Sequence, residues 1–362
     1  MKKTICLLAS LLLMLLITVT VTADEALGYK DEVYSDIKGI ELPEEAQKLD
    51  IDLSDPEAVL EIDNKNIFDY IVSAIKASVV EPLKILLIVA ALSLISQIMA
   101  SLTDNPESYE IMLVIITFVS ISGAIIRSFS SSIGAINSIQ AFMAAYVPIF
   151  ASISIASGNV AGALSYNSVV LYACEAVTLF ATLILKPILI CISVLSVTQA
   201  INSEIPDFTS SLRKAFTTII GLAMTIFTGV IGLQATVGRA ADGLGLRAGK
   251  YLVSSFVPVL GYTITQSYQT IKSSLSMIRS TIGVFGIVII AIAFSVPLIS
   301  IAVYRCFFTI GEWIASLCQS KRISSLMKGL NDVYSLLSVI LMMYFIMLII
   351  STGMLIALGG SA

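Results

Sequence analysis

The sequence has no histidine among its 362 residues, and only 13% of its residues are charged. Without histidine, imidazole-based metal sites and histidine acid–base catalysis are excluded. Five cysteines are present, but none lies in residues 24–80 and their spacing fits no metal motif, so we interpret them as packing residues. No phosphate-binding loop and no hydrolase signature is present either. We therefore expect no metal, no cofactor and no enzymatic activity.

Apolar residues are abundant, at 57% of the chain, which is too many for an ordinary soluble domain. Several mostly apolar runs of about 18 residues or more are long enough to cross a bilayer as helices. Clear examples are 83–102, about 282–304 and about 331–358. The sequence predicts an all-α polytopic membrane protein with about eight transmembrane helices, within a range of six to ten.

The N-terminus has the pattern of a signal peptide. A basic start, an apolar stretch and the small-residue site at Val21–Ala23 predict that residues 1–23 are a leader. The alternative is an uncleaved first transmembrane anchor. In either case, we expect the residues that follow to be exported.

Residues 24–80 form an acidic arm, with 15 acidic residues and five lysines. Residues 81–362 instead carry 14 basic and 10 acidic residues. Such an arm is usually solvated and partly disordered, and the alternative is a docking segment for a partner. Pro43 and Pro56 stand near the starts of two possible short helices.

Two apolar segments that contain proline indicate an internal duplication. AAYVPIFAS at 144–152 returns as SSFVPVLGY at 254–262, which places Pro148 and Pro258 110 residues apart. Pro187 and Pro297 have the same separation. The expected units are 81–109 (first span and loop), 110–214 (repeat 1), 215–328 (repeat 2) and 329–362 (final span and tail).

The four prolines are candidates for lining or gating a pathway. Proline removes a backbone hydrogen bond, and non-helical backbone persists at membrane depth only inside protein or beside water. Broken or re-entrant helices are therefore one interpretation, and proline-kinked ordinary spans are the other. Repeats with broken helices are a known way to build a membrane pathway.

The distribution of basic residues predicts the orientation. With residues 24–80 outside, the loops near 103–109, 201–214 and 319–328 are cytoplasmic, and the last two are basic as the positive-inside rule requires. The acidic loop at 103–109 and the basic segment 239–250 disagree with the rule. In this orientation the equivalent loops 201–214 and 319–328 share a side, so the repeat is parallel.

Four ionisable residues lie within apolar runs, where charge is expensive. Glu175 and Lys186 are 11 residues apart, and Arg305 and Glu312 are seven apart, so each pair falls on one helical face. Each pair could line a polar path or bind an ion. The alternative is a structural pair or a side chain that reaches the membrane surface.

Two segments carry a resemblance to a known family. YVPIFASISIASGNVAGA at 146–163 and RAADGLGLRAGKYLVSSFVPVLG at 239–261, preceded by a leader and an acidic exported arm, resemble the stage III sporulation protein AE family. The resemblance implies an integral membrane subunit of a secretion-like channel complex between mother cell and forespore. Expected partners are an ATPase and ring-forming proteins, and the expected location is the outer forespore membrane, with the arm in the intermembrane space.

Two functions follow from these expectations. The first is a channel subunit that supports forespore development and late gene expression. The alternative is a stand-alone permease for small solutes with a site at the repeat interface. A permease should depend on the four intramembrane charges, and a channel subunit should depend more on the proline segments. A purely scaffolding protein would tolerate changes at both.

Overall fold

The structure is a computed structural model that describes residues 29–47, 64–102, 106–202, 208–256 and 261–358. The predicted signal peptide and Pro258 lie outside the described residues. The described part contains helices and no strand, which confirms the predicted fold class. The labelled helices are α2 (Glu44–Gln47), α3 (Asn64–Leu102), α4 (Pro106–Ala156), α5 (Val160–Leu179), η2 (Phe180–Leu185), α6 (Lys186–Ile201), α7 (Phe208–Phe256), α8 (Gly261–Leu317) and α9 (Lys321–Leu358).

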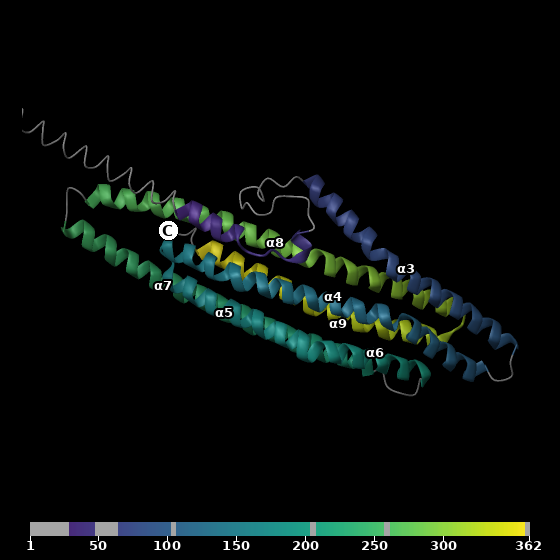
Figure 1. Ribbon diagram of the computed structural model, residues 1–362. Helices are drawn as coiled ribbons and strands as arrows, with labels where there is room; N and C mark the ends of the chain where they lie inside the picture. Colours follow the sequence, from purple (N-terminus) through teal and green to yellow (C-terminus); the bar gives the residue numbers. More distant parts are fainter. Residues whose placement is uncertain (1–28, 48–63, 103–105, 203–207, 257–260, 359–362) are drawn as a thin grey trace, which may run out of the picture.

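Six helical runs in the described part are long and apolar enough to cross a membrane. They are α3, α4, the continuous α5–η2–α6 run, α7, α8 and α9, and consecutive runs point in opposite directions (Figure 1). Six is the lower end of the predicted range. α4 runs parallel to α7, and α5–α6 runs parallel to α8, which is the arrangement that a parallel repeat requires (Figure 1). The duplication itself stays a prediction.

The helices are much longer than one bilayer requires. At 1.5 Å per residue, the 57 residues of α8 extend about 85 Å, whereas a hydrocarbon core is about 30 Å thick. α4 continues through Pro148 and α8 continues through Pro297. These two segments are therefore ordinary helices that contain proline, and they are not broken or re-entrant.

The apolar run at 168–200 is also continuous. A π-helix, η2, covers Phe180–Leu185 and leads directly into α6, where Pro187 stands near the first position. Proline lacks an N–H group and collides with the carbonyl four residues earlier. The wider π turn accommodates both effects without ending the helix.

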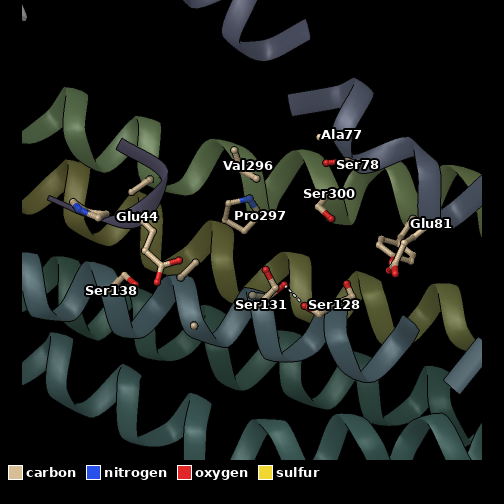
Figure 2. Close-up of a pocket in the computed structure, with 16 residues that line it drawn as sticks. Glu44, Ala77, Ser78, Glu81, Ser128, Ser131, Ser138, Val296, Pro297 and Ser300 are labelled. Carbon is tan, nitrogen blue, oxygen red and sulfur yellow. Dashed lines mark hydrogen bonds between the residues drawn. The ribbon is translucent and has the colours of Figure 1, made fainter. Parts of the chain in front are cut away.

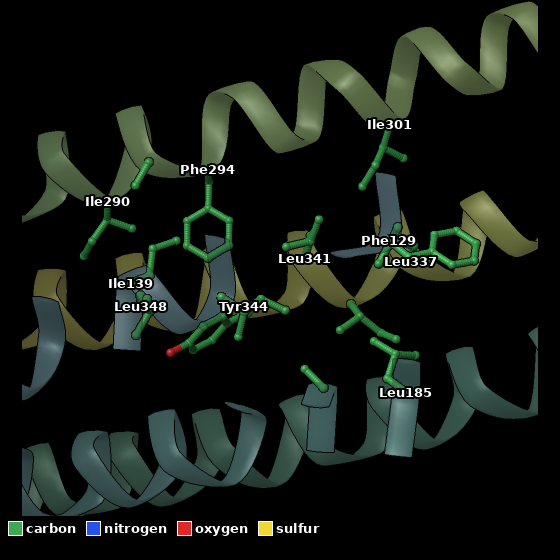
Figure 3. Close-up of a cluster of buried hydrophobic side chains, with 14 of the residues drawn as sticks. Phe129, Ile139, Leu185, Ile290, Phe294, Ile301, Leu337, Leu341, Tyr344 and Leu348 are labelled. Carbon is green, nitrogen blue, oxygen red and sulfur yellow. The ribbon is translucent and has the colours of Figure 1, made fainter. Parts of the chain in front are cut away.

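α9 forms the centre of the bundle and contacts α4, α5, α6, α7 and α8. Its buried side chains recur every three or four residues, so one wide apolar stripe faces its neighbours. Figure 3 shows Tyr344 of α9 beneath Phe294 of α8, and their rings meet edge to face at 5.7 Å. The apolar core therefore surrounds the last helix of the chain.

Two tight turns end helices at opposite ends of the bundle. At Gly158, which has φ 90°, the N–H groups of Gly158 and Asn159 bond the carbonyls of Ile155 and Ser154. This pattern is a Schellman motif, in which a residue of positive φ ends the helix. Gln319, with φ 58°, ends α8 in the same way, although it is not glycine.

Glycines bring α5 and α7 into close contact. A Cβ atom added at Gly238 would lie 2.9 Å from the Cα of Gly162. Small residues permit such approaches between membrane helices, where packing replaces the hydrophobic effect.

A charged cluster lies at the end of the bundle where α3, α6 and α8 finish. Arg322 of α9 donates to Glu107 of α4 and to the carbonyl of Ile201, and its backbone N–H donates to Glu110 at 3.1 Å. Described residues from the three segments predicted to be cytoplasmic, Glu107, Ile201 and Arg322, therefore meet at one end of the molecule. Their placement in the cytoplasm stays a prediction.

Part of the acidic arm packs on the bundle instead of remaining solvated. Residues 29–38 are helical, α2 follows Pro43, and we call residues 29–47 the docked arm. Val33 and Ile37 are buried, and α2 contacts α8. Burial raises the pKa of Tyr29, while a hydrogen bond with Ser152 of α4 opposes that rise. The helix α3 begins at Asn64, within the range of the predicted arm.

Candidate functional site

A polar cavity of about 400 Å³ lies between α2, α3, α4 and α8 (Figure 2). Seven of its 16 lining residues carry hydroxyl groups, although the surrounding bundle is apolar. We call it the serine cavity. Its lining residues are Pro43, Glu44, Ala77, Ser78, Glu81, Ser128, Ser131, Ser132, Gly134, Ala135, Ser138, Ala293, Val296, Pro297, Ser300 and Tyr304.

The wall from α4 is a stripe of small residues. Ser128, Ser131, Ala135 and Ser138 recur at intervals of three or four, which places them on one face of a helix. Ser132 is buried and donates its hydroxyl proton to the Ser128 carbonyl at 2.9 Å. Such back-bonding satisfies the donor and leaves oxygen lone pairs toward the cavity.

The wall from α8 contains Pro297, which is buried within the helix. Proline has no N–H to donate, so the carbonyl of Ala293 loses its usual helical partner. Ala293 also lines the cavity. The bundle thus combines serine hydroxyls on one wall with a freed backbone carbonyl on the other, and both can hold water or a polar solute.

One side of the cavity contains a charged network. Arg127 of α4 pairs with Glu81 of α3 at 2.9 Å, and the Tyr304 hydroxyl donates to Glu81 at 3.0 Å. Tyr304 stacks on Tyr334 of α9 with ring centroids 5.1 Å apart. The network therefore connects the cavity to the central helix.

The docked arm supplies another side of the cavity. Pro43 is buried there, and Figure 2 shows Glu44 reaching toward α4 beside Ser138. The cavity lining thus carries two carboxylates, Glu44 and Glu81. In the described part of the chain, no three Cys, Asp or Glu side chains gather closely enough to hold a metal ion.

The predicted prolines occupy different environments. Pro148 and Pro187 are exposed on the outer surface of their helices, whereas Pro297 lines the serine cavity. Pro258 cannot be placed, because it lies outside the described residues. Of the described candidates for a pathway, Pro297 is the one that borders a polar space.

The pair Glu175 and Lys186 does not come together. Glu175 is exposed and accepts a hydrogen bond from Gln140 at 3.0 Å. The π-helix η2 lies between the two residues and changes the helical phase on which their predicted common face depended. Lys186 is half-buried at the start of α6.

Arg305 and Glu312 are half-buried on α8 and form no ion pair with each other. Arg305 donates to the Asn331 side chain of α9 at 3.3 Å, and Asn331 donates to Thr309 at 3.3 Å. This arrangement joins α8 to α9 through amide and hydroxyl groups. Neither predicted pair therefore forms between its two members, and the contacts shown are those of Glu175 with Gln140 and of Arg305 with Asn331.

Sequence reasoning missed the serines of the cavity. A serine in an apolar helix commonly bonds its own backbone, so composition alone gives no sign of a cavity. The available signal is the spacing of Ser128, Ser131 and Ser138 on one face, next to Arg127. Glu44 could not be predicted, because its position depends on how the arm docks.

Comparisons with known proteins agree with the resemblance seen in the sequence. The family profile of stage III sporulation protein AE matches residues 55–359. The stage III sporulation protein AE of Bacillus subtilis (strain 168) is 23% identical over 169 residues. That match covers 46% of this chain and 42% of the relative, so it spans less than half the length of either. No solved structure matches the chain. Because the profile covers most of the sequence, the chain belongs to the stage III sporulation protein AE family.

Proposed function

We propose that the chain is the integral membrane subunit of a multiprotein, secretion-like channel that links mother cell and forespore and supports forespore development and late gene expression. Membership of the family gives the sporulation role. The observation that supports a channel role is the serine cavity. It is a polar space of about 400 Å³ between helices that otherwise pack through apolar side chains. Such spaces in membrane proteins mark pathways for water and polar solutes.

In this proposal the cavity is one segment of a longer path that the companion proteins complete. The proposed companions are an ATPase and ring-forming subunits, and the proposed location is the outer forespore membrane. The arm then lies in the intermembrane space. The six long helices agree with a multi-pass membrane protein. They extend beyond one hydrocarbon core, which leaves helix surface available for these companions.

A stand-alone permease is the second candidate, because the cavity lies within a single chain. A permease requires no companion to fill its cavity with water and solute. A channel subunit requires the assembled complex. The two candidates therefore differ in how water access depends on partners.

Cysteine labelling in sporulating cells tests the proposal. In a variant without native cysteines, Ser131→Cys and Ser300→Cys probe opposite walls of the cavity, and Leu87→Cys on the exposed face of α3 is the control for reagent entering through lipid. We expect a membrane-impermeant thiol reagent to label both cavity positions when the companions are present, and to lose that labelling when they are deleted. Labelling that persists without companions favours the permease. No labelling at either cavity position contradicts the pathway.

A further inference from the structure

The docked arm has two chemically different faces. Val33, Ile37 and Ile40 recur every three or four residues and are buried, with exposed fractions of 4%, 1% and 9%. Asp31 and Asp36 on the other face are exposed. An amphipathic segment of this kind is held by its apolar face against the bundle, while its charges remain in water.

The position of the arm connects it to the serine cavity. Tyr29 at its start hydrogen-bonds with Ser152 near the end of α4. At its other end Pro43 and Glu44 line the cavity, and α2 packs on α8. The arm therefore runs along the bundle from Ser152 to Ser138, beside which Figure 2 shows Glu44.

The arm is also a separable element. Its helical parts cover residues 29–38 and the four residues of α2. Helices this short are not stable in water without packing, so the docked and undocked forms differ mainly in the contacts with the bundle. The apolar side chains of the arm supply those contacts, so the loss of a buried one such as Ile37 shifts the balance between the two forms.

We infer that the docked arm closes the Glu44 side of the serine cavity and regulates access to it by undocking. This inference rests on the proposed function, because it assigns a control element to the same cavity. The arm precedes the residues 55–359 that match the family profile. When the arm is docked, the carboxylate of Glu44 and the ring of Pro43 cover the α4 wall beside Ser138. After the arm undocks, a polar solute reaches that wall from this side.

The first test measures the labelling rate of Ser138→Cys in the full chain without native cysteines. Ile37→Asp places a charge where Ile37 is 1% exposed, and an unpaired charge cannot remain buried, so the arm is released. Asp36→Asn, on the exposed face, is the matched control. We expect Ile37→Asp to speed labelling at Ser138→Cys about tenfold, a shift in the docking equilibrium of about 1.4 kcal/mol. Asp36→Asn should leave the rate unchanged.

Ser131→Cys provides the position control, because Ser131 also lines the cavity but is exposed with the arm docked. Its labelling rate should not depend on Ile37→Asp. Equal rates at Ser138→Cys with and without the substitution overturn closure by the arm and leave the water-filled cavity intact. Absence of labelling at Ser138→Cys in both forms, with Ser131→Cys labelled, overturns the arm's role and contradicts the pathway at that wall.

A second measurement tests the docked form before any destabilising change is made. A photo-crosslinking amino acid placed at Glu44 in the full-length membrane protein should form adducts with α4 or α8, identified by mass spectrometry of the digested protein. Adducts confined to lipid or to other parts of the chain would overturn the docking that the inference requires. The adducts with α4 and α8 should disappear when Ile37→Asp is added and should persist with Asp36→Asn.

Discussion

The hydroxyl of Tyr146 on α4 donates a hydrogen bond to the carbonyl oxygen of Ile282 on α8, with an oxygen–oxygen distance of 3.0 Å. The tyrosine is fully buried, and its ring lies between Phe142 and Phe150 with centroids 5.3 and 5.5 Å away. Gly286, one turn along α8, leaves the space that this ring occupies. The contact fixes the separation of the two helices that form opposite walls of the serine cavity.

Gly286→Ala should destabilise the protein because its Cβ would overlap the buried Tyr146 ring. Overpacking of this kind costs about 1–3 kcal/mol. Gly229→Ala on α7 is the matched control, because no atom lies within 4 Å of its added Cβ, and alanine favours a helix over glycine by up to about 1 kcal/mol. Thermal unfolding of the purified protein in detergent should therefore shift in opposite directions. Equal shifts would show that α4 and α8 do not approach each other in this way.

Pro297→Ala should reduce the number of heat-resistant spores more than Pro148→Ala does. The first substitution restores an N–H that bonds the Ala293 carbonyl and removes a polar group from the cavity, whereas Pro148 is exposed on α4. Both changes replace proline inside a helix, so neither should lower helix stability. Spore counts and protein abundance in the native host separate the two effects. A larger defect with Pro148→Ala at normal abundance would contradict the role assigned to Pro297.

The sequence predicts two features of the fold. One is the helical class, and the other is that the connections near 103–109, 201–214 and 319–328 lie at the same end of the bundle. Both depend on features that repeat along the chain. Apolar length indicates the spans, and the basic loops 201–214 and 319–328 indicate one end of the bundle, although the basic segment 239–250 does not follow that rule. The same features do not reveal the path of a helix through proline, since Pro148 and Pro297 sit in continuous helices with different surroundings. The residues that flank a proline in the sequence do not determine whether that proline is exposed or buried.

Neither predicted charge pair forms an ion pair in the described structure. Spacing places Glu175 and Lys186 on one face only if the helix keeps its period, and η2 changes that period. Arg305 and Glu312 share a helix, but neighbouring α9 offers Asn331 to the arginine. The local helix period decided the first outcome, and a tertiary contact decided the second. The burial of Val33 and Ile37 could likewise not be predicted, because the composition of the arm is that of a solvated segment.

Gln319→Gly should stabilise the turn between α8 and α9. Gln319 has φ 58°, a left-handed conformation that costs a non-glycine residue about 1 kcal/mol or more. Glycine adopts it without that penalty, so we expect the free energy of unfolding to rise by about 0.5–1 kcal/mol. Ser316→Gly, inside α8, should lower it by a similar amount. Thermal unfolding in detergent compares the two variants, and a loss of stability in Gln319→Gly would show that its side chain makes a contact worth more than the strain.

Arg279→Met should be tolerated, although the arginine is 1% exposed within α8. Its Nη2 donates to the Ile356 carbonyl at 3.4 Å, while Nε and Nη1 have no hydrogen-bond partner in the described part of the chain. A buried charge without a counter-ion opposes folding, and an apolar side chain of similar volume is often neutral or more stable by about 1–4 kcal/mol.

Arg322→Met is the contrast, because Arg322 bonds Glu107, Glu110 and the Ile201 carbonyl, and its loss should cost about 1–3 kcal/mol. Unfolding in detergent measures both. A loss above about 3 kcal/mol for Arg279→Met would contradict the expected tolerance, because the breaking of a buried ion pair costs about 3–5 kcal/mol whereas the loss of an unpaired buried charge does not.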